Sequence, residues 1–190
     1  MGGRLVVISG PSGVGKTTVC DEVLKLPGFR RVVTATSRPP RKGEVDGVHY
    51  HFYDAPAFES AVARGEFLEH ARVHGHLYGT PRRALLDGLE KAPFLLLNID
   101  VQGARQVREA IRKGAPIPSV FIFLEPPSLE ELGRRLGSRG TDRPEEVEVR
   151  LRTALSELEE RDLYDHVVVN DDIRSAVERV LEAVGYGGRK

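Results

Sequence analysis

The residues with the clearest chemistry lie near the N-terminus, where positions 10–17 read Gly-Pro-Ser-Gly-Val-Gly-Lys-Thr. The apolar run Leu5–Ile8 comes directly before them, and a helix-like stretch, Thr18–Lys25, comes directly after. A strand, a glycine-rich loop and a helix N-terminus in this order bind phosphate, because the glycines let backbone N–H groups point inward around phosphate oxygens. The loop residues expected to hold a nucleotide are Gly10, Pro11, Ser12, Gly13, Val14, Gly15, Lys16 and Thr17.

Two side chains of this loop carry specific chemistry. Lys16 places a full positive charge beside the terminal phosphates, and the helix dipole adds a partial one. The Thr17 hydroxyl is of the kind that binds Mg²⁺ in such loops. The sequence therefore predicts a site for a magnesium-bound nucleotide.

A second phosphate site is indicated by the pattern Thr-Ala-Thr-Ser-Arg-Pro-Pro-Arg-Lys-Gly-Glu-Val-Asp-Gly-Val-His-Tyr-His-Phe at positions 34–52. Arg38 and Arg41 are separated by two prolines, which stiffen the backbone so that two guanidinium groups can converge on one phosphate. The phenolic hydroxyls of Tyr50 and Tyr78 can donate further hydrogen bonds to the same phosphate.

Together with Phe-Leu-Glu-His at 67–70, Leu-Tyr-Gly-Thr at 77–80 and Asn-Ile-Asp-Val-Gln-Gly at 98–103, this pattern closely resembles the guanylate kinases. The resemblance covers nearly the whole chain. It implies an enzyme of purine nucleotide metabolism that transfers the γ-phosphoryl group of ATP to GMP, with Mg²⁺ as cofactor. It also implies that the GMP phosphate is held by Arg38, Arg41, Tyr50 and Tyr78, and that the remaining GMP contacts include Thr34, Glu69, Thr80 and Asp100.

Glu69 gives a physical reason for the choice of guanine. Guanine presents N1–H and N2–H₂ as adjacent donors that one carboxylate can accept, whereas adenine presents a bare N1 lone pair that a carboxylate repels. A buried polar group left unpaired by the wrong substrate can discriminate by ~10⁴-fold. Thr34 can add a hydrogen bond to guanine O6; the family more often has serine there, which carries the same hydroxyl.

Asp100 follows the apolar run Phe94–Ile99, where the carboxyl ends of parallel strands line a ligand crevice. It is expected either to hold a water of the Mg²⁺ shell or to touch GMP. The family usually carries a second aspartate two positions earlier, and this chain has Asn98, which removes one negative charge.

The resemblance further implies three arginines, Arg135, Arg139 and Arg150, that surround the transferring phosphoryl group with positive charge. Phosphoryl transfer asks mainly for in-line positioning and for cations, which these residues and Lys16 supply. Arg134 and Arg143 are interpreted as solvated charges. Asn170 resembles the adenine-side contact of the family, and a turn-forming role is its alternative.

The fold expected around these residues is an α/β three-layer P-loop kinase fold with a parallel sheet. Apolar runs without polar alternation are typical of strands buried on both faces; they are Leu5–Ile8, Phe94–Ile99, Val120–Leu124 and Val167–Val169. Segments of helical period lie between and after them: Thr18–Lys25, Arg82–Leu89, Gly103–Arg112, Leu129–Leu136, Glu146–Glu160 and Ile173–Val184.

Residues 30–80 break this rhythm with short runs, prolines and glycines, which indicates a small, partly antiparallel insertion. The resemblance then divides a single domain, 1–190, into three parts. The core is 1–33, 81–125 and 155–190, a mixed α/β insertion that binds GMP is 34–80, and a mobile lid is 126–154.

Composition restricts the partners. The 28 Lys and Arg balance the 28 Asp and Glu, so no overall field attracts nucleic acid or an anionic membrane, and neither is an expected partner. The apolar N-terminal run is too short for a signal peptide, which favours a cytoplasmic protein. The single cysteine, Cys20, is expected to pack in the core. The expected state is a monomer or a homodimer.

Two alternatives remain beside the guanylate kinase interpretation. One is an enzyme like the ribose bisphosphate phosphokinases, which the full set of Arg38, Arg41, Tyr50, Glu69 and Tyr78 argues against. The other is a guanylate-kinase-like module that binds proteins without catalysis, which an intact Lys16 and Thr17 argue against.

Overall fold

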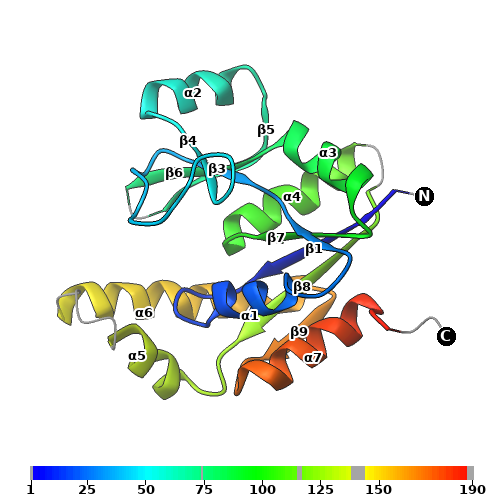
Figure 1. Ribbon diagram of the computed structural model, residues 1–190. Helices are drawn as coiled ribbons and strands as arrows, with labels where there is room; N and C mark the ends of the chain where they lie inside the picture. Colours follow the sequence, from blue (N-terminus) through cyan, green and yellow to red (C-terminus); the bar gives the residue numbers. More distant parts are fainter. Residues whose placement is uncertain (1, 74, 115–116, 138–143, 188–190) are drawn as a thin grey trace. The chain divides into compact units, whose positions relative to one another are not determined.

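The computed structural model describes residues 2–73, 75–114, 117–137 and 144–187 (Figure 1). The chain forms two compact units. The first comprises residues 1–5, 30–95 and 102–118, and the second comprises 6–29, 96–101 and 119–190. The expected acceptor residues from Thr34 to Thr80 therefore belong to the first unit, and the phosphate-binding loop belongs to the second.

The core sheet is parallel, and its five strands within the described residues follow the order β2-β7-β1-β8-β9. The strands are β1 (Arg4–Ser9), β2 (Phe29–Arg31), β7 (Phe94–Asn98), β8 (Ser119–Glu125) and β9 (His166–Val169). Neighbouring strands are not consecutive in sequence except for β8 and β9, and that pair is parallel, so crossover connections join the strands as in α/β proteins. The predicted fold class is confirmed.

Burial explains why the strands formed where apolar runs were found. Residues Leu5–Ser9 of β1 and Val120–Leu124 of β8 are buried without interruption, as expected of strands covered on both faces. For the run at Val167–Val169 this expectation is wrong. Val167 is 44 % exposed and only Val168 is fully buried, because β9 is the last strand of the sheet. Three residues of β2 are too few to give a pattern, and the sequence did not predict this strand.

The six predicted helices are present; the last of them has the predicted bounds, and the other five have shifted ends. They are α1 (Lys16–Val23), α3 (Arg82–Lys91), α4 (Val101–Lys113), α5 (Leu129–Gly137), α6 (Pro144–Leu158) and α7 (Ile173–Val184). A short 3₁₀ helix, η1 (Glu159–Leu163), follows α6. In the second unit α1 and α7 pack together, α5 packs on α6, and the thiol of Cys20 is buried as expected.

The insertion forms a second sheet, whose strand order is β4-β3-β6-β5. The strands are β3 (Thr34–Thr36), β4 (Tyr50–Phe52), β5 (Phe67–Val73) and β6 (His76–Pro81). β3 and β4 pair in parallel, while β6 is antiparallel to both β3 and β5, so the sheet is mixed as expected.

A helix that the sequence did not predict, α2 (Ala55–Ala63), covers one face of this sheet (Figure 1). Phe58 and Ala61 of α2 pack against Ala35, Phe67 and Leu77 of the strands. The Phe58 and Phe67 rings stack with centroids 4.5 Å apart. The insertion therefore has a small hydrophobic core of its own.

Among the described residues, none of the helices is both long and apolar enough to cross a bilayer.

Candidate active site

The glycines of loop 10–17 are required by its close contacts. Gly10 has a φ of +140°, and a Cβ there would lie 2.2 Å from the Leu124 carbonyl oxygen of β8. Gly15 has a φ of +96°, and a Cβ there would lie 2.5 Å from the Asn170 side-chain nitrogen. Only glycine combines such φ values with so little space.

Helix α1 begins at Lys16, two residues earlier than predicted, because the left-handed Gly15 turns the loop directly into the helix. No side chain caps the helix N-terminus, which leaves its backbone N–H groups to bind an anion. The Lys16 ammonium folds over the loop and donates to the carbonyls of Gly10 at 2.6 Å and Pro11 at 2.9 Å. The loop thus has the form that phosphate binding needs.

Glu157 of α6 contacts this loop, a contact that no local sequence pattern predicts. Its Oε2 accepts a hydrogen bond from the Ser12 N–H at 3.3 Å. Burial raises the pKa of Glu157, and the negative charge of Asp100 raises it further. The Lys16 ammonium and the hydrogen bond from the Ser12 N–H lower this pKa. Lys16 and Asp100 therefore both lie within electrostatic reach of Glu157.

Asn170 and Arg135 both donate hydrogen bonds to the backbone of the loop at Val14. The Asn170 amide donates to the Val14 carbonyl at 2.7 Å and is buried. The Arg135 guanidinium donates to the same carbonyl at 3.4 Å and to the Asn170 carbonyl at 3.1 Å, and Glu131 pairs with it at 2.7 Å. These contacts connect the end of α5 to the loop.

The other expected lid arginines are partly described. Arg150 is half-buried on α6, and its spacing from Ala154 and Glu157 places the three residues on one face of that helix. Arg139 lies outside the described residues, as does Arg143.

In the first unit, Arg38, Tyr50 and Tyr78 gather as predicted. The Arg38 guanidinium carbon lies 5.6 Å from the centre of the Tyr50 ring, and the Tyr50 and Tyr78 rings are 6.3 Å apart. Arg38 is buried despite its charge, because Glu44 forms two hydrogen bonds with it, both 2.9 Å long.

Glu44 organises this basic cluster, a role that the sequence did not assign. Besides pairing with Arg38, it accepts the Arg41 backbone N–H at 2.6 Å. The Arg38 guanidinium lowers the pKa of Glu44 to about 2, and the Glu44 carboxylate raises the pKa of Arg38. Arg41 is exposed, and its contact with the cluster is the backbone hydrogen bond to Glu44.

Glu69 and Thr80 meet on the two adjacent strands β5 and β6. The Thr80 hydroxyl donates to Glu69 Oε1 at 2.6 Å, and both side chains are buried. Ala35 is opposite Gly79 and Thr36 is opposite Tyr78, so continuing this register brings Thr34 opposite Thr80. The two residues expected at the base, Thr34 and Glu69, thus lie in a row with Thr80 across β3, β6 and β5.

A β-bulge puts Glu69 on the right face of the sheet. Phe67 is opposite Pro81 but Glu69 is opposite Thr80, so β5 carries an extra residue between them. Without it, Phe67 and Glu69 would share a face, since side chains alternate along a strand. Because of it, Phe67 packs against α2, while Glu69 shares the opposite face with Thr80 and Tyr78. The carboxylate and the basic cluster therefore lie on the same side of the insertion.

Comparison with known proteins identifies this arrangement. The guanylate kinase family model matches residues 2–185, which is nearly the whole chain. The chain belongs to the guanylate kinase family. Guanylate kinases transfer the γ-phosphoryl group of ATP to GMP, and the chain is an ATP:GMP phosphotransferase.

Individual guanylate kinases are similar to this chain over most of their length. The enzyme of Frankia casuarinae is 51 % identical over 178 residues, covering 93 % of this chain and 94 % of its own. That of Carboxydothermus hydrogenoformans is 45 % identical over 183 residues, covering 96 % and 87 %. The crystal structure of guanylate kinase from Anaplasma phagocytophilum superposes with a TM-score of 0.77 at 35 % identity, covering 100 % and 88 %.

These similarities favour the guanylate kinase interpretation over both alternatives, the phosphosugar kinase and the non-catalytic binding module. The predicted residues fall into two sets. The first unit holds Thr34, Arg38, Arg41, Tyr50, Glu69, Tyr78 and Thr80, and the second holds the loop with Asp100, Arg135, Arg150 and Asn170.

Proposed function

We propose that the first unit binds GMP through the two clusters on one face of the insertion sheet. Arg38, Arg41, Tyr50 and Tyr78 hold the phosphate. The support is the convergence of a buried guanidinium and two phenolic side chains, since arginine pairs with phosphate oxygens through two parallel hydrogen bonds. The cluster also has a fixed shape before GMP arrives, because Glu44 already holds Arg38 and the Arg41 backbone.

Guanine is read by Glu69, Thr34 and Thr80. The Glu69 carboxylate accepts N1–H and N2–H₂, and the Thr34 hydroxyl bonds O6. The observation that carries this proposal is the buried Glu69, which the bulge turns to the face of Tyr78 and whose Oε1 is oriented by the Thr80 hydroxyl. A base that lacks two adjacent donors would leave the buried carboxylate without hydrogen bonds, which weakens the binding of that base.

ATP binds to loop 10–17, with Lys16 at the terminal phosphates and Asn170 on the adenine side. Supporting this are the uncapped N-terminus of α1 and the lysine folded over the loop. Transfer then requires a GMP phosphate oxygen to meet the γ-phosphorus in line, with ADP as the leaving group. Arg135, Arg139 and Arg150 are the cations proposed to balance the charge that spreads over the transferring group.

Mg²⁺ is the metal that this donor set fits. Thr17 and Asp100 offer a hydroxyl and a carboxylate, and Asp100 and Lys16 both lie near enough to Glu157 to influence its pKa. Hard oxygen donors of this kind suit Mg²⁺, which keeps several waters and is bound through few carboxylates. When bound, the metal would neutralise charge on the ATP phosphates.

The proposed roles are divided among three parts of the chain. They are a core of 1–33, 81–125 and 155–190, a GMP-binding insertion of 34–80 and a lid of 126–154. Closure of the lid and the insertion would keep water away from the phosphoryl group. We place the reaction in the cytoplasm, where ATP and GMP are found together.

Calorimetric titration with GMP and with guanosine tests the two halves of the GMP site separately. Arg38→Gln should weaken GMP binding by about 100-fold, or ~3 kcal/mol, and leave guanosine binding nearly unchanged, because guanosine has no phosphate. Glu69→Gln should weaken both ligands. If Arg38→Gln weakened guanosine as much as GMP, the phosphate assignment would be wrong.

A further inference from the structure

Strand β5, which carries Glu69, is the outermost strand of the insertion sheet. Its partner on one side is β6, and on its other edge no strand of the described residues binds the backbone groups. At His70, a side chain binds these backbone groups in place of a neighbouring strand. The Gln106 Nε2 donates to the His70 carbonyl at 2.8 Å, and the Gln106 Oε1 accepts the His70 N–H at 3.2 Å. One amide thus satisfies both backbone groups, as a neighbouring strand would.

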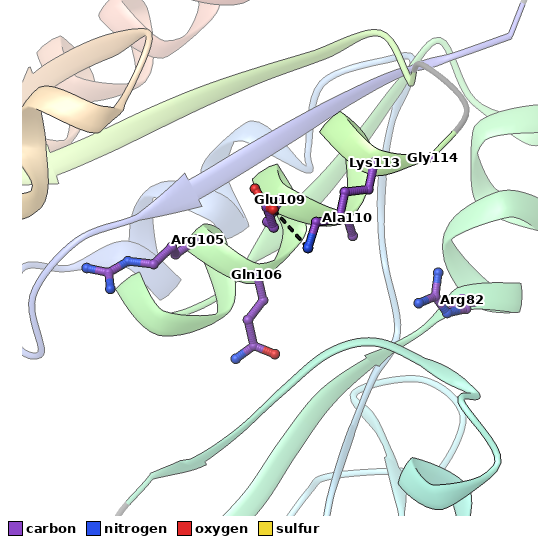
Figure 2. Close-up of a pocket in the computed structure, with 7 residues that line it drawn as sticks. All are labelled: Arg82, Arg105, Gln106, Glu109, Ala110, Lys113 and Gly114. Carbon is purple, nitrogen blue, oxygen red and sulfur yellow. Dashed lines mark ion pairs between the residues drawn. The ribbon is translucent and has the colours of Figure 1, made fainter.

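Gln106 comes from α4, far from β5 in sequence but in the same compact unit. Figure 2 shows its side chain extending away from the helix, whereas Glu109 and Lys113 pair with each other along α4 at 3.0 Å. It lines an open pocket whose other residues are Arg82, Arg105, Glu109, Ala110, Lys113 and Gly114.

The position of this contact gives it a consequence for the base site. His70 directly follows Glu69, and the bulge that turns Glu69 toward Thr80 lies just before it. The face on which Glu69 lies depends on the position of the bulge, because a register shift of one residue at this point would move Glu69 to the α2 face. Fixing the backbone at His70 holds the bulge where it is.

We propose that Gln106 is the positioning residue for guanine selectivity: its amide binds both backbone groups of His70 and thereby holds the bulge that presents Glu69 to the base. This inference rests on the proposed role of Glu69. Only an amide fits, because it carries a donor and an acceptor on one planar group. A glutamate would turn a carboxylate oxygen toward the His70 carbonyl, and an asparagine would be one methylene short.

Two variants of Gln106 test the proposal. Gln106→Glu keeps the shape and loses the donor, and Gln106→Met keeps the length and loses both hydrogen bonds. Lys113→Ala is the matched control, because it removes a contact on the same helix and leaves Glu109 paired with Arg112. Each variant is measured with GMP and with inosine 5′-monophosphate, which lacks the 2-amino group and so offers Glu69 one donor instead of two.

A positioning role predicts a selective loss. For both Gln106 variants KM for GMP should rise by about 10-fold or more, and the preference for GMP over inosine monophosphate should fall by about 10-fold, with KM for ATP unchanged within about twofold. Lys113→Ala should match the unmodified enzyme. If both acceptors lost the same factor, Gln106 would only support the fold and the proposal would be overturned.

A double-mutant cycle separates this inference from the function on which it rests. If Gln106 acts through Glu69, adding Gln106→Met to Glu69→Gln should cause little further loss of preference. If Glu69→Gln alone left the preference unchanged, the base-reading proposal would fail first. If Glu69→Gln reduced the preference and Gln106→Met did not, this inference alone would fail.

Hydrogen exchange of the His70 amide in the unmodified enzyme tests the same contact without any variant, so the test does not depend on how well the variants fold. The His70 N–H faces no strand, so its protection depends on Gln106. We expect it to exchange at least ~10-fold more slowly than an open edge amide. Exchange at the rate of an unprotected amide would overturn the proposal.

Discussion

At the scale of single residues, the proposed base selectivity depends most on Glu69. Glu69→Gln replaces a carboxylate oxygen with an NH₂ donor that faces the donors of guanine, and the neutral amide no longer repels adenine N1. We expect the kcat/KM ratio of GMP to AMP to fall by about 100-fold or more, with most of the change on the GMP side. Steady-state rates with both acceptors measure it. An unaltered ratio would mean that another residue reads the base.

Glu44 makes a pH-dependent contribution to stability. Its pKa is lowered from 4.5 to about 2 by the Arg38 guanidinium, so the folded state favours the ionised form. The stabilisation is therefore complete above the unfolded pKa of about 4.5, and it is lost as the pH falls toward 2. Urea unfolding of the enzyme and of Glu44→Gln should differ by about 1–2 kcal/mol at pH 7 and converge near pH 2. A constant difference across this range would contradict the assignment.

At the scale of structural elements, the proposed function of the phosphate-binding loop depends on Lys16. Lys16→Ala removes the charge proposed at the terminal phosphates and the two hydrogen bonds to the Gly10 and Pro11 carbonyls. We expect kcat to fall by about 10³-fold or more in a coupled assay of ADP release. Lys25→Ala removes an exposed lysine that pairs with Glu22 just beyond α1, and it should leave kcat unchanged. Equal losses in both variants would show that the effect is not specific to the loop.

Two glycines of the second unit should respond in opposite ways to alanine. Gly10→Ala puts a Cβ against the Leu124 carbonyl at a φ of +140°, and it should cost about 3 kcal/mol or more of unfolding free energy. Gly133 lies within α5 with no atom within 4 Å of a Cβ, so Gly133→Ala should add about 0.5–1 kcal/mol. Chemical denaturation measures both, and a stable Gly10→Ala would show that the loop has room to move.

Local patterns and long-range contacts differ in what a sequence can reveal. The loop, the buried strands β1, β7 and β8 and six helices could be predicted because each depends on residues near in sequence. The bulge before Glu69 could not, because it arises from the pairing of β5 with β6 and the packing of Phe67 on α2. Glu157 and Gln106 were missed for the same reason: each contacts a backbone group of a distant element. The exposed Val167 shows that an apolar run does not reveal which strand ends a sheet.

At the scale of the whole molecule, the two units carry complementary chemistry. The second unit holds the loop and the basic residues proposed for ATP, and the first holds a cation cluster and a carboxylate on one sheet face. Since charges of both signs balance over the chain, binding of two anionic nucleotides depends on these local clusters. Neutralising Arg38 or Lys16 should therefore affect one nucleotide far more than the other.

The rate of ADP release with ATP and each of four acceptors, GMP, AMP, CMP and UMP, tests the central claim most directly. The account predicts rapid turnover with GMP and a kcat/KM at least ~10³-fold lower with the other three, because only guanine offers Glu69 two adjacent donors. Turnover with AMP equal to that with GMP, or no turnover with any acceptor, would contradict it.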